Sequence, residues 1–126
     1  MKAAHATITV LSTLTFLMSV SVSVHAQTSS ITGTWDMTVE TSVGGGTPVF
    51  VLVLESDSII RGEYTGALGE GLPVTGTIQG SDFTLRFSIS GAVVVYTGTV
   101  EGDTMEGTVD LAGYAQGTFT GRRRQE

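Results

Sequence analysis

A three-residue unit, a glycine followed two positions later by a large apolar residue, constrains the fold of this chain more than any other feature. Residues two apart in a strand point to the same face, so each glycine shares a face with the large residue after it. Glycine inside a strand normally weakens it, but here it permits tight coiling and leaves room for a neighbour's bulk. The repeat favours a closed barrel, with a β-sandwich carrying glycine bulges as the alternative. The six units are Gly33-Thr34-Trp35, Gly62-Glu63-Tyr64, Gly76-Thr77-Ile78, Gly98-Thr99-Val100, Gly107-Thr108-Val109 and Gly117-Thr118-Phe119.

Turn signals rich in glycine, serine and aspartate return about every ten residues, which is typical of a meander of short strands. The segments between them are rich in threonine and valine, which favour the pleated sheet. The sequence therefore predicts an all-β fold, an antiparallel up-and-down barrel of about eight strands and of the calycin-like kind. We expect Gly44–Gly46 to form a hairpin turn. The strands are predicted near residues 32–41, 48–55, 59–66, 72–79, 82–89, 92–100, 103–110 and 114–122.

The N-terminal segment has the pattern of a secretory signal peptide. Lys2 precedes an apolar stretch over residues 8–24, and the stretch ends in Val24-His25-Ala26. The stretch is short and interrupted by serines, whereas a spanning helix needs about 20 mostly apolar residues. We therefore expect a signal peptide over residues 1–26, one domain over residues 27–126 and no membrane span after processing. The mature protein is expected in the periplasm or outside the cell.

Cleavage would remove the side chains that most catalytic sites use. Both histidines and the only lysine lie in the predicted signal peptide, and the chain has no cysteine and no asparagine. This composition excludes Ser-His and Cys-His nucleophiles, Schiff-base lysines and His/Cys zinc sites, so we expect no metal site and no cofactor. The mature chain would keep five arginines and all twelve carboxylates, which gives it a net charge of −7. This negative charge argues against a nucleic-acid partner. The run Arg122–Arg124 is expected to be a solvated tail.

The alternation of apolar and polar residues predicts which side chains point into the barrel. The interior of a barrel of about eight strands is just wide enough to be filled by side chains or to hold one small ligand. Both alternatives stay open. Trp35, Tyr64 and Tyr96 each carry one polar atom on an aromatic body and would orient a small ligand. With Met37 and Phe119 they form the predicted ligand-binding set. The predicted interior comprises Trp35, Met37, Val39, Phe50, Leu52, Leu54, Ile60, Tyr64, Leu72, Val74, Ile78, Phe83, Leu85, Phe87, Ile89, Val94, Tyr96, Val100, Met105, Val109, Leu111 and Phe119.

Two of the predicted strands are apolar on their outer face as well. The residues concerned are Val49, Val51 and Val53 on one strand, and Val93 and Val95 on another. An exposed apolar row favours association, so these valines predict a homodimer. The alternative is that a loop or a terminal segment covers them.

Two stretches carry a resemblance to a known family. Ile31-Thr32-Gly33-Thr34-Trp35 is similar to the first strand of the avidin/streptavidin family, a branch of the lipocalin-like small barrels. Arg61-Gly62-Glu63-Tyr64-Thr65-Gly66-Ala67-Leu68-Gly69-Glu70 is similar to its third strand and the loop that follows. The resemblance implies a secreted ligand-binding barrel, with Tyr64 at a biotin-contacting tyrosine position and Thr41 as a hydroxyl contact.

The chain departs from that family at several positions. Met37 and Gly66 stand where the family has a polar biotin contact and a serine, and Trp35 is the only tryptophan. The later tryptophans that wall the biotin site are therefore missing. The glycine–threonine rhythm also resembles small lipocalin-like modules of exported bacterial proteins.

Three functions remain compatible with this sequence. The first is a non-enzymatic exported barrel that binds a small hydrophobic ligand or a protein partner. The second is a barrel-type cyclase or isomerase, in which a shaped cavity with tyrosine and carboxylate groups accelerates a reaction mainly through proximity. The third is a structural or accessory module with a filled core. A carboxylate that reaches Tyr64 or Tyr96 in an open pocket would favour the enzyme.

Overall fold

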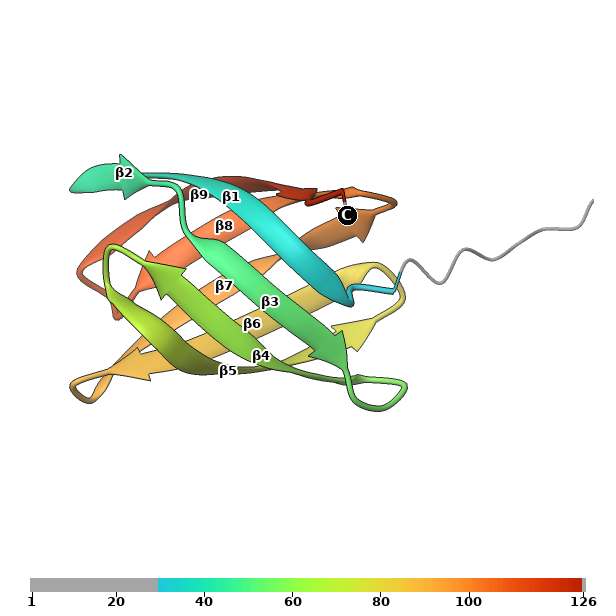
Figure 1. Cartoon of the computed structure of the whole chain (residues 1–126). Helices are drawn as coiled ribbons and strands as arrows, with labels where there is room; N and C mark the ends of the chain where they lie inside the picture. Colours follow the sequence, from blue (N-terminus) through green and yellow to red (C-terminus); the bar gives the residue numbers. More distant parts are fainter. Residues whose placement is uncertain (1–29, 126) are drawn as a thin grey trace, which may run out of the picture.

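The computed structural model describes residues 30–125, which form one antiparallel sheet that closes on itself (Figure 1). Each strand pairs with its neighbour in the chain, except that β1 pairs with both β2 and β3, and β1 also meets β9 to close the barrel. The predicted all-β, up-and-down barrel is confirmed, and the sandwich alternative is wrong because one continuous sheet contains every strand of the described chain. The strands are β1 (Gly33–Thr41), β2 (Gly44–Gly46), β3 (Val49–Leu54), β4 (Ile59–Gly66), β5 (Gly69–Gln79), β6 (Asp82–Ile89), β7 (Ala92–Glu101), β8 (Thr104–Leu111) and β9 (Ala115–Arg123).

The predicted signal peptide, residues 1–26, lies outside the described residues. Cleavage after Ala26 and the domain bounds 27–126 therefore stay predictions. Within residues 30–125, no helix is long and apolar enough to cross a membrane.

β2 and β3 are two parts of one strand that Pro48 interrupts. Both pair antiparallel with β1 and keep a single register across the interruption. There the Met37 N–H donates to the Pro48 carbonyl oxygen over 3.0 Å, and proline has no N–H to return the bond. The barrel wall is thus eight-stranded, and the expected turn at Gly44–Gly46 is wrong. The chain turns instead at Ser42 and Val43, and the glycines extend the hairpin.

Most other strand bounds fall within one residue of the prediction, but β5 begins three residues early, at Gly69. A register shift between Tyr64 and Gly66 bends the end of β4. Gly69 and Gly71 then adopt positive φ angles of 155° and 62°, which favour glycine. The turn is therefore confined to Ala67 and Leu68, and pairing resumes sooner than the glycines in the sequence indicate.

The core occupies the inside of the barrel, as the alternation predicts. Every residue of the predicted interior is buried or packs at the edge of the buried cluster; Leu54, Leu72, Ile89 and Leu111 are the partly buried ones. Ile31 and Ala115 are also buried and were not predicted. Ile31 lies just before β1, where the alternation of a strand gives no signal.

The strand glycines lie opposite large residues on the neighbouring strands. Gly98 of β7 is paired with Phe83, and Gly107 of β8 is paired with Phe119. A Cβ on Gly98 would overlap the carbonyl oxygen of Glu106 on the adjacent strand. The glycines therefore allow neighbouring backbones to approach closely, which the tight coiling of a small barrel requires.

The outer valines do not form one surface. Val51 and Val53 on β3 are about half exposed, as is Val93 on β7. In the closed ring of strands, three strands separate β3 from β7 in either direction, so the two rows lie on opposite walls. No single patch can hold all five valines, and a homodimer through one of the rows stays a prediction.

Candidate functional site

The two ends of the barrel differ in how they are closed. The turns after β1, β4, β6 and β8 meet at one end, which we call the open end (Figure 1). The turns after β3, β5 and β7 meet at the other, together with Ser30 and Gln125; this is the closed end.

Trp35 and Ile31 form the floor of the closed end. Both side chains are fully buried, and the indole N–H of Trp35 donates to the Ile31 carbonyl oxygen over 2.9 Å. The guanidinium carbon of Arg123 lies 4.5 Å from the centre of the Trp35 ring, within the range of a cation–π contact. The polar atom of Trp35, predicted to orient a ligand, is therefore used within the fold.

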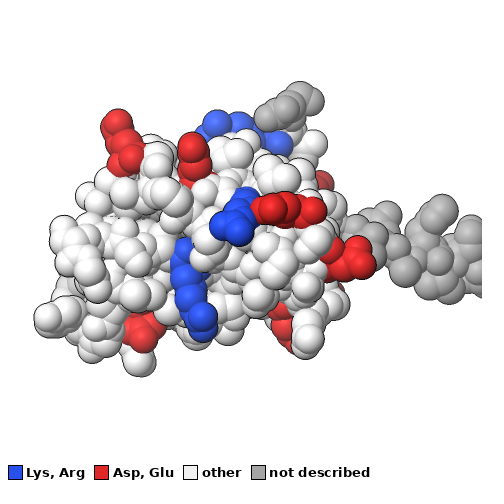
Figure 2. Space-filling model, turned by 90° about the horizontal axis from the view of Figure 1, so that it is seen from below, with Lys and Arg blue, Asp and Glu red and all other residues white. Residues whose placement is uncertain are grey.

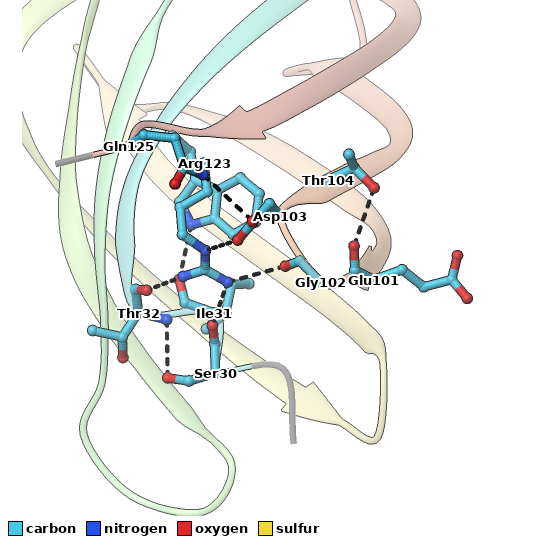
Figure 3. A network of polar contacts seen from close by, with 10 residues as sticks. Ser30, Ile31, Thr32, Glu101, Gly102, Asp103, Thr104, Arg123 and Gln125 are labelled. Carbon is cyan, nitrogen blue, oxygen red and sulfur yellow. Dashed lines mark hydrogen bonds and ion pairs between the residues drawn. The ribbon is translucent and has the colours of Figure 1, made fainter. Parts of the chain in front are cut away.

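Arg123 ties three segments of the closed end together (Figure 3). Its Nε donates to Asp103 Oδ1 over 2.9 Å, and its Nη2 donates to the carbonyl oxygens of Ser30 (2.7 Å) and Gly102 (3.1 Å). Nη1 donates to the carbonyl oxygen of Thr32. The prediction of a solvated tail is wrong for this residue, whose side chain is only 20% exposed, because β9 continues through it and places it over the barrel floor.

Six aromatic residues fill the middle of the barrel. Phe50 meets Tyr64 and Tyr96 edge to face, with ring centres 5.3 and 5.0 Å apart. Phe87 stacks on Tyr64 at 4.3 Å, and Phe119 meets Tyr96 at 5.1 Å. The sixth ring, Phe83, lies 6.2 Å from Phe119. Such edge and offset contacts stabilise a core beyond the area they bury.

A cavity of about 180 Å³ lies above this aromatic layer, at the open end. Tyr64 and Tyr96 form its floor, and the turn residues Ala67 and Leu68 form one wall. The cavity reaches the barrel wall where Pro48 interrupts the second strand. The complete lining is Val39, Thr41, Val43, Gly44, Gly45, Gly46, Pro48, Tyr64, Ala67, Leu68, Tyr96 and Leu111.

The structure therefore divides the predicted ligand-binding set. Tyr64 and Tyr96 line the cavity. Trp35, Met37 and Phe119 do not line it; each is at most 2% exposed and packs in the core. The sequence reasoning missed Val43, Leu68 and the backbone of β2, because a turn residue shows no strand periodicity.

Two positions that the avidin resemblance singled out also lie here. Thr41 lines the cavity, but its Oγ1 donates to the carbonyl oxygen of Gly44 over 2.5 Å and holds the hairpin turn. A Cβ on Gly66 would lie 2.6 Å from the Tyr64 hydroxyl oxygen and 2.9 Å from Pro48 Cβ. The serine of that family would therefore displace Tyr64, which explains why this backbone needs glycine.

The two tyrosines are the ionisable residues of the lining. Burial raises the pKa of the Tyr96 phenol, and the neighbouring Tyr64 adds to the rise. Burial also raises the pKa of Tyr64, while a hydrogen bond with the Leu68 backbone opposes it. Both phenols therefore stay protonated at neutral pH, and the cavity is an uncharged apolar site with hydroxyl groups.

Charged side chains lie outside this cavity. Figure 2 shows acidic and basic groups scattered over one face of the molecule, with one basic group touching an acidic one and uncharged areas between the others. Ion pairs join Arg61 to Glu55 at 2.8 Å and Arg124 to Asp36 at 2.6 Å. The hydrogen bond from Arg124 holds the pKa of Asp36 below its usual value. In residues 30–125, no cluster of three or more acidic residues could hold a metal ion.

Comparison with known proteins identifies the class of fold. No protein-family model matches this chain, and no curated protein matches it. A de novo designed fluorescence-activating β-barrel is similar in structure, with a TM-score of 0.51 and 16% identity over 74% of this chain and 93% of that one.

Two further barrels are similar at lower scores. Fatty-acid-binding protein 1 of Echinococcus granulosus has a TM-score of 0.48 and 10% identity over 75% of this chain and 98% of that one. A point mutant of the fluorescent protein UnaG has a TM-score of 0.46 and 13% identity over 76% and 97%. The closed strand order and the likeness to the designed barrel define a small antiparallel up-and-down β-barrel. They do not point to the avidin or lipocalin families in particular.

Proposed function

We propose that this protein is an exported, non-enzymatic barrel that binds a small apolar molecule at its open end. The cavity between Tyr64, Tyr96 and Leu68 carries this proposal. A dry apolar cavity of about 150 Å³ accommodates benzene, so a volume of about 180 Å³ suits a molecule with one ring. The ring would lie on the aromatic floor, and a hydroxyl or carbonyl substituent would reach a tyrosine hydroxyl.

The chemistry of the lining supports binding over catalysis. An acid/base reaction would use a carboxylate against Tyr64 or Tyr96, and the lining contains none. Two tyrosines that stay protonated can donate and accept hydrogen bonds at neutral pH, but they do not act as bases. The filled aromatic layer below also restricts a ligand to the open end.

Fluorine NMR with 4-fluorophenol tests the binding site directly. We expect saturable binding with a Kd of about 1 mM, because burial of about 160 Å² of apolar surface at about 25 cal/mol per Å² is worth about 4 kcal/mol. Leu68→Ala removes part of the cavity wall and should weaken binding by about fivefold, or about 1 kcal/mol. Ile59→Ala is the matched control, since Ile59 is a 38% exposed aliphatic residue at the far end of β4 and Leu68 is 41% exposed.

The proposal fails if 4-fluorophenol shows no saturable binding, or if the two variants weaken it equally. Export is tested separately by intact mass. Protein purified from its own host should begin at Gln27, and a native mass spectrum of the same sample would show any ligand that it retains.

A further inference from the structure

β2 leaves one of its edges unpaired at the mouth of the cavity. In the described chain β2 pairs with β1 alone. The hydrogen bond from Met37 N–H to the Pro48 carbonyl makes these two a hydrogen-bonded pair of the ladder. Hydrogen-bonded and non-bonded pairs alternate in an antiparallel ladder, so Gly45, opposite Glu40, directs its N–H and C=O away from β1.

The strand that would cover this edge ends too soon. β4 pairs with β3 as far as Thr65 opposite Val49, and it ends at Gly66. The chain then turns at Ala67 and Leu68, so β4 does not continue alongside β2. Gly46 and Pro48 on one side, and the turn residues Ala67 and Leu68 on the other, all line the cavity.

The free edge carries no side chain that would repel another strand. Natural proteins commonly protect a free edge with charged residues, proline or short length. Here Pro48 and the three-residue length restrict pairing to a short segment, but Gly44, Gly45 and Gly46 carry no side chain. A Cβ on Gly44 or Gly46 would meet no atom within 4 Å, so another backbone can approach closely.

The rim of the open end is apolar. Val43 is 74% exposed, Leu68 41% and Tyr114 90%, and all three lie on or beside its turns. An apolar rim beside a free main-chain edge suits an extended peptide with one apolar side chain, because main-chain bonds supply affinity and a pocket supplies specificity.

We propose that the β2 edge accepts a short extended peptide by strand addition, with an aromatic or branched aliphatic side chain in the cavity. The proposal uses the same cavity as the proposed function. Residues that are paired across a ladder point to the same side of the sheet. Gly46 is paired with Val39, whose side chain points into the barrel. When the peptide adds antiparallel to β2, its residue opposite Gly46 therefore points into the cavity, and the residue after it lies opposite Gly45 and exchanges hydrogen bonds with it.

N-methylated peptides test this arrangement, because they show which N–H groups of the peptide bond to β2. In acetyl-Thr-Phe-Thr-amide, phenylalanine would lie opposite Gly46 and the second threonine opposite Gly45. N-methylation of that threonine removes a bonded N–H and should weaken binding at least tenfold by calorimetry. N-methylation of the phenylalanine is the matched control, because its N–H points away from β2, and affinity should stay within about twofold.

Competition with 4-fluorophenol separates the two proposals. Displacement of 4-fluorophenol by the peptide, with the expected N-methyl pattern, supports strand addition. If 4-fluorophenol binds but the peptide does not displace it, or if both N-methyl peptides bind equally, strand addition is wrong and the small-ligand function stands. If the peptide binds with the expected pattern and 4-fluorophenol does not, the small-ligand function is wrong. A dimer in sedimentation that the peptide dissociates would place a second copy at this edge and overturn the inference.

Discussion

At the scale of single residues, Arg123 shows how one side chain can close the end of a barrel. Its guanidinium covers Trp35 and donates to three carbonyl oxygens and one carboxylate. Arginine suits this position because its planar group can stack and donate in several directions at once.

Replacement of Arg123 should therefore be costly. We expect Arg123→Ala to lower the free energy of unfolding by about 1–3 kcal/mol, because four hydrogen bonds of a charged donor and the cover of the Trp35 ring are lost together. Arg123→Lys should recover only part of this loss. Urea denaturation measures both, and Arg122→Ala, an exposed neighbour, should change stability by less than about 0.5 kcal/mol. Equal effects of Arg122→Ala and Arg123→Ala would contradict the role given to Arg123.

Tyr96 predicts the response of the fold to alkaline pH. Its pKa is raised in the native state, so the unfolded chain loses this proton first as the pH rises. The tyrosine contribution to stability is then constant below the ordinary pKa near 10 and declines above it, by up to about 1.4 kcal/mol per pH unit per group. Denaturation midpoints measured from about pH 8, below the ordinary tyrosine pKa, to about pH 11, above it, give the slope.

Two variants check the assignment of this slope. Tyr96→Phe should reduce it, since the phenol with the larger rise in pKa is gone, while Tyr64, whose pKa is also raised, keeps a smaller slope. Tyr114→Phe changes a tyrosine that is 90% exposed and should leave the slope unchanged. A slope that Tyr96→Phe does not alter would show that other groups control alkaline stability.

At the scale of strands, the glycine units set the distance between neighbouring backbones. Gly98 and Gly107 are paired with each other, and a Cβ on either would overlap a carbonyl oxygen of the other strand. The sequence indicated crowding by large side chains. The structure adds that the adjacent backbone itself leaves no room.

Valine at either position should therefore destabilise the barrel strongly. We expect Gly98→Val or Gly107→Val to cost more than about 3 kcal/mol, because strands must separate to admit the side chain. Gly46→Ala is the control, since its Cβ would meet no atom within 4 Å. Thermal unfolding compares the three, and unchanged melting temperatures for the valine variants would show that these strands can separate freely.

At the scale of the whole molecule, the sequence predicts the wall of the barrel better than its ends. A period of two fixes which face of a strand is buried, so Phe50, Leu85 and Val100 could be assigned to the interior from the sequence alone. Arg123 and Ser30 meet across 93 positions of the chain, and no local pattern reports such a contact.

The candidate site was predictable only in part for the same reason. Tyr64 and Tyr96 follow strand periodicity and were identified, whereas Val43 and Leu68 lie on turns. The free edge of β2 depends on where Pro48 interrupts a strand relative to the end of β4. That relation is set by register between strands, which the sequence does not state.

Closure between β1 and β9 has a consequence for how this chain is made. Thr38 and Thr120 face each other in the closing pair, yet they lie at opposite ends of the described chain. A nascent chain that has not yet produced β9 therefore holds two open edges, β1 and β8, and both can pair with other molecules. Synthesis of the final strand is the step that ends this exposure, and a late stop codon would leave the product open to aggregation.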